Sequence, residues 1–261
     1  DLNGEYKLIA DITIDRSIVI NKEKSVTLDL NGHVLNLTDT SGGDSWITVE
    51  GGGNLTITDS FPQQVQSKLG NLAPNAPDPL QCYLTINTQV RAQNIAKLQT
   101  LSHDSASAML FDGVFIHMPR AATRANFADH RTLIYQNQVV GEAYHLGLDL
   151  ASVRNAEIPA ANSGKVVFTG DMGVYGNLCL IDHGLGLFSL YAHMNDFTVK
   201  LGDLVKKGDL IGHTDSTGLA FGDHLHFGII VGGLEVTPIE WLDPKWVRNI
   251  VNNINGTVPA R

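Results

Sequence analysis

Cysteine is scarce in this chain, and its scarcity excludes two kinds of structure. The 261 residues include only two cysteines, Cys82 and Cys179. Neither belongs to a C-x-x-C pair, so the sequence offers no thiolate zinc site and no disulfide-rich scaffold. The two residues could form one disulfide, although an isolated pair is more commonly two buried thiols, and the sequence leaves both states open.

Long apolar runs and clustered basic charge are also lacking. No run approaches the roughly 18 apolar residues that cross a bilayer, so we expect no membrane span. No signal-peptide pattern is present, and because the chain begins at Asp1 rather than Met, we expect a mature or trimmed form. The 18 Lys and Arg residues are scattered and outnumbered by 27 Asp and Glu residues, giving a net charge of -9. A nucleic-acid partner is therefore not expected, because phosphate binding relies on clustered basic side chains.

What is present is the composition of a globular protein, with 43% hydrophobic and 17% charged residues. Short alternating segments separated by glycine and asparagine turns predict a mainly β fold with few helices. Near the N-terminus, VTLDLNGHVLNLT and ITVEGGGNLTITD are similar to each other. They resemble the first coils of the right-handed β-helices of bacterial surface proteins, so we expect a β-helix-like module over residues 1–60.

Composition and periodicity divide the rest of the chain into four segments. Residues 61–82 contain four prolines and are expected to form a linker without a helix or a central strand. A helical connector is expected over 83–110, because apolar residues recur at helical spacing over 88–103. Strand patterns, beginning with FDGVFIHM and RTLIYQNQVV, predict a β-rich domain over 111–245, and residues 246–261 are expected to form a C-terminal helix and tail.

Three short segments contain histidines in a pattern that suggests a metal site: HLGLD (residues 145–149), YAH (191–193) and HLHF (224–227). On a straight strand the Cα atoms of His145 and Asp149 would lie about 13 Å apart, too far to share one ion comfortably. The strand must therefore bend, and Gly147 is where it can bend. HxxxD alone is a weak signal.

The HLHF segment is more informative, because its apolar residues favour a strand. His224 and His226 then project from the same face, with Cα atoms about 6.6 Å apart. One imidazole can hold a metal ion while the other faces a substrate. A catalytic zinc ion needs three protein ligands and one open position, and the three segments supply that number with two histidines to spare.

The sequence around these histidines resembles a known family. The segments are HLGLDLA, SGKVVFTGDMGVYGN, IDHGLGLFSLYAHM, VKLGDLVKKGDLIGHTDSTG and DHLHFGI. In this order they are similar to zinc metallo-endopeptidases of the lysostaphin and LytM type, enzymes that cut peptide bonds in peptidoglycan. The resemblance extends from about residue 113 to residue 241, and implies an antiparallel β-sheet metallopeptidase core within the domain at 111–245.

The resemblance also assigns roles. It implies one Zn²⁺ per chain, bound by His145, Asp149 and His226, with His193 and His224 as the catalytic pair. We expect His224 to orient or deprotonate the attacking water and His193 to stabilise the oxyanion or protonate the amine, although the two roles could be exchanged. Family members that only scaffold or activate other hydrolases lack several of these residues, so keeping all five favours an active enzyme. Peptidoglycan peptides as substrate imply a location in the cell envelope, periplasmic or extracellular.

Three other functions match parts of the sequence. A cupin-like iron oxygenase would use two histidines and Glu235, but it requires a further histidine after His226, and none follows. A lipoyl or biotinyl domain would place a modified lysine at a hairpin tip, and Lys206 and Lys207 lack the neighbours of such a lysine. A non-hydrolytic wall-binding or hydrolase-activating protein of the same fold stays open, and zinc content and cleavage of peptidoglycan separate it from the endopeptidase.

Overall fold

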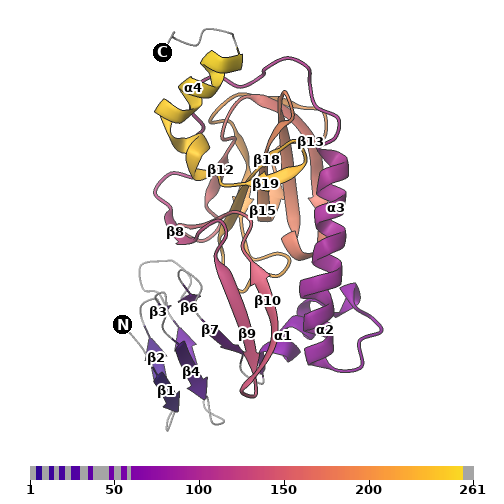
Figure 1. Cartoon of the computed structure of the whole chain (residues 1–261), viewed down its shortest axis with the longest axis vertical. Helices are drawn as coiled ribbons and strands as arrows, with labels where there is room; N and C mark the ends of the chain where they lie inside the picture. The colour runs from indigo at the N-terminus through magenta and orange to yellow at the C-terminus, as the bar shows by residue number, and fades with distance from the viewer. Residues whose placement is uncertain are drawn as a thin grey trace.

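The computed structural model describes residues 60–254 continuously and, before them, seven short strands (Figure 1). These strands are β1 (Gly4–Lys7), β2 (Ile12–Ile14), β3 (Ile18–Ile20), β4 (Ser25–Asp29), β5 (Leu35–Leu37), β6 (Ile47–Val49) and β7 (Asn54–Ile57). Each of the first four pairs in parallel with the strand three places further along: β1 with β4, β2 with β5, β3 with β6, and β4 with β7. Three strands per turn, stacked in register on three sides, make a β-helix-like module, as the repeat predicts.

The module does not end in a free edge at β7. Strand β7 pairs in parallel with β9 (His130–Tyr135), and β9 forms an antiparallel hairpin with β10 (Gln138–Tyr144). The resulting sheet has the order β1-β4-β7-β9-β10. The two-residue turn of this hairpin, Gln136 and Asn137, has positive φ at both positions, as the tight turns that match the twist of a hairpin require.

Residues 61–82 are not the linker that their prolines suggest, and that prediction is wrong. The helical elements are α1 (Ser60–Leu69), the 3₁₀ turn η1 (Gly70–Leu72), α2 (Pro79–Thr85), the π-helical turn η2 (Ile86–Val90) and α3 (Arg91–Leu101). Pro62 lies in the first turn of α1 and Pro79 is the first residue of α2, positions where a missing N–H costs nothing. Asp78 caps α2 by accepting a hydrogen bond of 2.9 Å from Gln81 N. Pro62 and Pro79 therefore lie where helices start and do not prevent them.

The first part of residues 83–110, where a helical connector is predicted, is helical. Helix α2, η2 and α3 follow one another without a break, and α3 ends at Leu101. The segment FDGVFIHM beyond it was expected to be a strand but is irregular. Its backbone N–H groups bond to separate segments, Phe115 to Trp241 O and Ile116 to Ala161 O, so no single strand pairs with it.

A ten-stranded sheet forms the main body and has the order β16-β13-β14-β15-β18-β11-β8, with β12, β17 and β19 attached. All of its pairings are antiparallel. The strands are β8 (Ala122–Ala125), β11 (Leu148–Ala151), β12 (Glu157–Pro159), β13 (Gly164–Asp171), β14 (Asn177–Gly184), β15 (Leu187–Phe197), β16 (Leu204–Val205), β17 (Leu210–Thr214), β18 (Leu225–Val231) and β19 (Leu234–Val236). The predicted fold class, mainly β with an antiparallel core and few helices, is confirmed.

The sheet is buried on both faces. Side chains alternate between the two faces along its central strands, and both sets lie in hydrophobic clusters. On β15, Leu187 and Tyr191 belong to one hydrophobic cluster, while Phe188, Leu190 and Ala192 belong to another. Helices α1–α3 cover the face that carries the second cluster. Figure 1 shows α3 running alongside the sheet. Their buried contributions to that cluster are Val65, Leu69, Cys82, Tyr83, Ile86, Val90 and Leu98. The helices are therefore part of the core of this domain.

The C-terminal part and the cysteines complete the described structure. The 3₁₀ turn η4 (Ile239–Leu242) leads into α4 (Pro244–Ile254), so the predicted terminal helix begins slightly earlier than expected. Cys82 and Cys179 are both buried and unpaired with each other. Of the helices in the described residues, none has the length and apolar character needed to span a bilayer.

The core position of the helices can be tested with Ile86→Ala. Because the Ile86 side chain is fully buried, with 0% exposure, its truncation should lower the free energy of unfolding by about 2–5 kcal/mol, measured by urea denaturation. Ile239→Ala is the matched control, since Ile239 is 54% exposed and should cost far less. An unchanged free energy of unfolding in Ile86→Ala would mean that the helices are a linker and not part of the core.

Candidate active site

His145 and Asp149 flank the bend that the sequence predicts. His145 lies just after β10, Asp149 lies on β11, and the chain bends at Gly147 between them. The bend brings His145 Nε2 to 2.9 Å from Asp149 Oδ1. A straight strand would have held the two groups apart, so the bend is what allows both side chains to reach one point.

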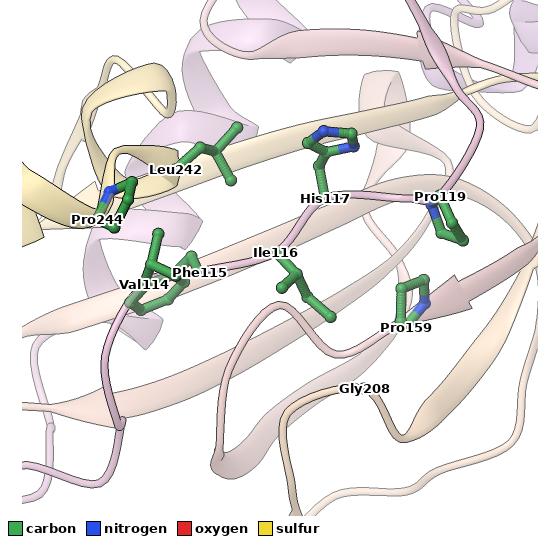
Figure 2. Close-up of a pocket in the computed structure, with 9 residues that line it drawn as sticks. All are labelled: Val114, Phe115, Ile116, His117, Pro119, Pro159, Gly208, Leu242 and Pro244. Carbon is green, nitrogen blue, oxygen red and sulfur yellow. The ribbon is translucent and has the colours of Figure 1, made fainter.

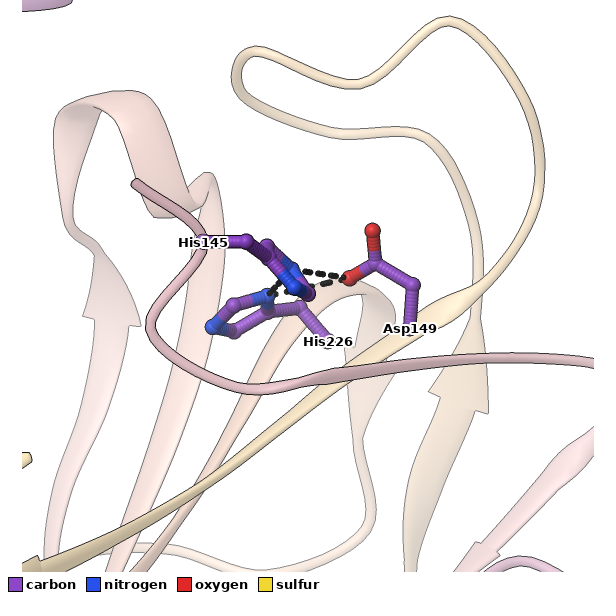
Figure 3. A group of neighbouring side chains, drawn as sticks. All are labelled: His145, Asp149 and His226. Atoms are coloured by element: carbon purple, nitrogen blue, oxygen red, sulfur yellow. Dashed lines mark hydrogen bonds and ion pairs between the residues drawn. The ribbon is translucent and has the colours of Figure 1, made fainter. Parts of the chain in front are cut away.

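His226 reaches the same point from β18. Its residue position is directly opposite Asp149 in the antiparallel pairing of β11 with β18, so the two side chains share one face of the sheet. His226 Nδ1 lies 3.0 Å from Asp149 Oδ1 and 3.0 Å from His145 Nε2. Figure 3 shows the three side chains turned toward one another. Among the described residues, this is the group of His, Cys, Asp and Glu side chains whose spacing could hold a metal ion.

The hydrogen bond made by His145 leaves its other ring nitrogen available for a metal ion. His145 Nδ1 lies 2.8 Å from Asn126 O, which can only accept, so Nδ1 donates and Nε2 is the atom that can present a lone pair. That lone pair faces a carboxylate oxygen, which is also an acceptor. One proton could join two such atoms, but the third atom, His226 Nδ1, is equally close to both. A metal ion satisfies all three at once, and two imidazoles with a carboxylate are a usual zinc donor set.

His193 joins the site through an irregularity in β15. Its neighbour Ala192 is paired with His226, so regular alternation would direct the His193 side chain to the opposite face. The pairing of β15 with β14 contains an extra residue between Tyr191 and Met194, and His193 has φ +61°. This bulge and left-handed backbone let its ring lie 5.9 Å from the His226 ring. His193 Nδ1 donates to Thr217 O at 2.7 Å, which fixes the ring.

His224 lies two residues before His226 and projects to the same side. Its backbone forms an isolated bridge with Asp215, and its Nδ1 donates to Gly222 O at 2.9 Å. Its Nε2 lies 3.5 Å from Asp149 Oδ1, and its ring centroid is 4.8 Å from that of His193. All five side chains named from the sequence are thus brought together in one cluster.

Burial and mutual charge set the protonation of the cluster. The side chains of His145, Asp149, His224 and His226 are only 9%, 16%, 9% and 6% exposed. Burial acts to raise the pKa of Asp149, but the neighbouring His145 and His224 hold it well below its usual range. Burial lowers the pKa of His226 to about 4 and that of His193 well below its ordinary value. Neutral rings beside an ionised carboxylate are what a divalent cation requires.

His224 is the exception among the imidazoles. Burial acts to lower its pKa, but the Asp149 carboxylate, the hydrogen bond to Gly222 O and the nearby Asp223 together raise the pKa above its ordinary value. The ring of His224 therefore takes up a proton more readily than those of His193 and His226.

Tyr175 is a residue of this site that the sequence does not single out. It lies in the 3₁₀ turn η3 (Gly173–Tyr175), within the glycine-rich segment between β13 and β14. Its ring centroid is 5.7 Å from that of His226, at an angle of 63°, and its hydroxyl donates to Glu235 Oε1 at 2.9 Å. Glu235, the carboxylate that an iron site would have used, is thus the partner of Tyr175 and is not one of the three converging groups.

Two cavities in the described part of the chain differ in whether their lining residues adjoin the cluster. One, of about 590 Å³, is lined by Val114, Phe115, Ile116, His117, Pro119, Pro159, Gly208, Leu242 and Pro244 (Figure 2). It contains none of the five clustered residues. A second, of about 300 Å³, lies between α3 and the sheet and includes Leu146 and Glu235, which adjoin the cluster.

Comparisons with known proteins cover the part of the chain that contains the cluster. Residues 143–238 match the sequence profile of peptidase family M23. The DD-carboxypeptidase/endopeptidase Mpg of Neisseria meningitidis serogroup B is 37% identical over 95 residues, which cover 36% of this chain and 22% of Mpg. The murein hydrolase activator NlpD of Salmonella typhimurium is 34% identical over 113 residues, which cover 43% of this chain and 30% of NlpD. The chain thus spans less than a third of the length of either relative.

A solved structure supports the fold. The crystal structure of a peptidase M23 from Pseudomonas aeruginosa aligns with a TM-score of 0.50 and 23% identity, covering 60% of this chain and 62% of that one. At this level of identity the likeness concerns the fold alone.

The bend at Gly147 gives a test of the cluster. A Cβ atom at this position would lie 2.7 Å from His226 Nε2, His226 Cε1 and Phe227 O. Gly147→Ala should therefore displace the His226 ring and weaken zinc binding by about 10- to 100-fold, measured by competition with a chelator. Gly141→Ala is the control, because its added Cβ would make only ordinary contact, 3.6 Å from Leu133. Equal zinc affinity in both variants would contradict a close approach of Gly147 to a metal-binding ring.

Proposed function

Because residues 143–238 form a peptidase family M23 domain, we propose that this protein is a zinc-dependent endopeptidase that hydrolyses peptide bonds in bacterial peptidoglycan. The observation that carries the proposal is the convergence of His145 Nε2, Asp149 Oδ1 and His226 Nδ1 at 2.9–3.0 Å from one another. Two further histidines beside that point supply groups that can move a proton. The substrate proposed is a stem peptide or cross-bridge of peptidoglycan, which agrees with the names of several relatives.

The three converging residues would hold the ion. When bound in such a site, zinc polarises the scissile carbonyl and lowers the pKa of a water molecule towards neutrality. With two imidazoles and one carboxylate as protein ligands, a tetrahedral ion keeps one position for water or substrate. One Zn²⁺ per chain is therefore proposed.

His224 is the proposed general base. Its Nδ1 donates to Gly222 O, so Nε2 is the atom that can receive the proton of the attacking water. The nearby Asp149 carboxylate stabilises the ring once it is protonated. The same ring can then return the proton to the departing amine.

His193 is proposed to act on the opposite reacting group. Its Nδ1–H is committed to Thr217 O, so Nε2 faces the shared space with His224. Burial holds the pKa of His193 well below its ordinary value, so the resting ring is neutral. Once Nε2 has taken up a proton from the attacking water, His193 can stabilise the developing oxyanion or pass that proton to the amine. The assignment of the two roles to His193 and His224 can be exchanged without changing the ligand set.

A second function is a non-hydrolytic activator, since one relative, NlpD, is named a murein hydrolase activator. The presence of all five side chains in one cluster favours the enzyme, because an activator has no need of a complete set of ligands and proton carriers. A chain that binds no stoichiometric zinc, or binds zinc without cleaving purified peptidoglycan, would favour the activator. Digestion of muropeptides of known composition, followed by mass analysis, identifies the bond that is cut.

We further propose that the protein acts in the cell envelope, periplasmic or extracellular, where peptidoglycan is found. Its partners are then peptidoglycan peptides, and no role in nucleic-acid binding is proposed, in keeping with the net charge of -9.

The ligand assignment predicts the effect of two substitutions. His145→Ala and Asp149→Ala should each abolish both zinc retention and peptidoglycan cleavage, because the two protein ligands that remain are too few to hold the ion. Zinc is measured by elemental analysis of the dialysed protein, and cleavage by release of soluble muropeptides. His213→Ala is the control, since His213 pairs with Asp196 outside the cluster and should keep both properties.

The catalytic assignment predicts a different result for His224→Ala. This variant should keep stoichiometric zinc but lose turnover by about 10²- to 10⁴-fold, the usual contribution of a general base. The same elemental analysis and muropeptide assay separate the two effects. If His224→Ala strips the metal instead, His224 is a ligand and the division of roles is wrong.

A further inference from the structure

His226 differs from the other histidines of the cluster in how its ring is held. His145, His193 and His224 each donate Nδ1–H to a backbone carbonyl oxygen. His226 instead turns Nδ1 toward the metal position, and its buried Nε2 has no hydrogen-bond partner among the described residues. A ligating histidine usually has its second nitrogen fixed by a hydrogen bond, which orients the ring. The orientation of His226 must therefore have another cause.

Packing supplies that cause on two sides. Gly147 is so close that an added Cβ would lie 2.7 Å from the ring atoms of His226, so the backbone forms one wall. Tyr175, which is only 4% exposed, provides another, with its ring set edge-on to that of His226 at a centroid distance of 5.7 Å. Such tilted aromatic pairs are favoured over face-to-face stacks and restrict the rotation of both rings.

Tyr175 is in turn fixed by Glu235. The hydroxyl donates to Glu235 Oε1 at 2.9 Å, a bond between residues 60 positions apart in the sequence. Glu235 lies on β19, directly opposite Ile230 of β18, and Ile230 is four residues beyond His226 on the same strand. The ligand and the residue that anchors its neighbour are therefore held by one pair of hydrogen-bonded strands.

Helix α3 secures the other end of the Tyr175 turn. Val174 N donates to Asn94 Oδ1 at 2.9 Å, and a Cβ on Gly173 would lie 2.7 Å from the same oxygen. Burial raises the pKa of Glu235, and the Tyr175 hydrogen bond and the Arg91 guanidinium at the start of α3 act to lower it, so that the pKa is about 7. The helices thus support the turn from the face of the sheet that they cover.

We propose that Tyr175 and Glu235 are positioning residues for zinc binding. Tyr175 orients the His226 ring by packing, in place of the missing hydrogen bond at Nε2, and Glu235 anchors Tyr175. This inference rests on the proposed function, because it concerns the metal ligand His226. It assigns to Glu235 the role of holding a neighbour of the ligand set, a role distinct from ligation.

The test is the zinc affinity of purified full-length variants, measured by competition with a chromophoric chelator, together with the visible spectrum of the Co²⁺-substituted protein. Tyr175→Leu removes the ring and the hydroxyl, and should weaken zinc binding by about 10- to 100-fold. Glu235→Ala should weaken it by a smaller factor and shift the Co²⁺ bands, because Tyr175 loses its anchor. Tyr175→Phe keeps the packing and should retain more affinity than Tyr175→Leu.

Two controls separate positioning from general damage. Glu235→Gln keeps an oxygen that can accept from the Tyr175 hydroxyl, and should restore the affinity lost in Glu235→Ala. Glu240→Ala changes an exposed carboxylate in η4 and should bind zinc like the wild type. If Tyr175→Leu fails to fold, the comparison of Glu235→Ala with Glu235→Gln decides the matter.

Wild-type zinc affinity in both Tyr175→Leu and Glu235→Ala would overturn the inference while leaving the endopeptidase proposal intact. A wild-type chain that binds no zinc would overturn both, and this outcome is recognised before any variant is compared. A wild-type chain that binds zinc but cleaves no peptidoglycan would overturn the endopeptidase alone, and the affinities of the variants would still decide the role of Tyr175.

Discussion

The site depends on three electron-pair donors being held closer together than they would stay by themselves. Two imidazole nitrogens and a carboxylate oxygen lie 2.9–3.0 Å apart, and a divalent cation is the group that turns this arrangement from repulsive to stabilising. The antiparallel pairing of β11 with β18 sets two of the donors opposite each other, and the bend at Gly147 brings in the third. The buried sheet beneath them resists relaxation, since both of its faces are packed.

Much of the fold follows from local patterns, and the part that does not has a specific cause. Alternating strands and the internal repeat are visible because a period of two needs no knowledge of distant residues. The helices at 60–85 escape prediction because proline is judged by its cost inside a helix, whereas Pro62 and Pro79 lie in first turns. The apolar residues of these helices bury themselves against a sheet more than 80 positions later in the chain, which no local window contains.

The candidate site divides in the same way. The five residues that converge could be named from the sequence, because three histidine-bearing segments in one order and the family resemblance that they carry point to them. The position of the His193 side chain could not be predicted from the sequence. Regular alternation would direct it to the opposite face of the sheet, and the bulge in β15 depends on tertiary pairing. Tyr175 was missed because it lies in a glycine-rich turn that suggests only hairpin geometry, and Glu235 attracted attention as a ligand when its partner is a phenol.

The hairpin of β9 and β10 connects the N-terminal coils to the strand that leads into the candidate site. Strand β9 continues the sheet of the N-terminal coils through β7, and β10 ends at Tyr144, the residue before His145. Hydrogen-bonded strands therefore connect the coils to His145, the first residue of the converging group. A surface that held the coils would also orient the proposed active site, because one hairpin belongs to both.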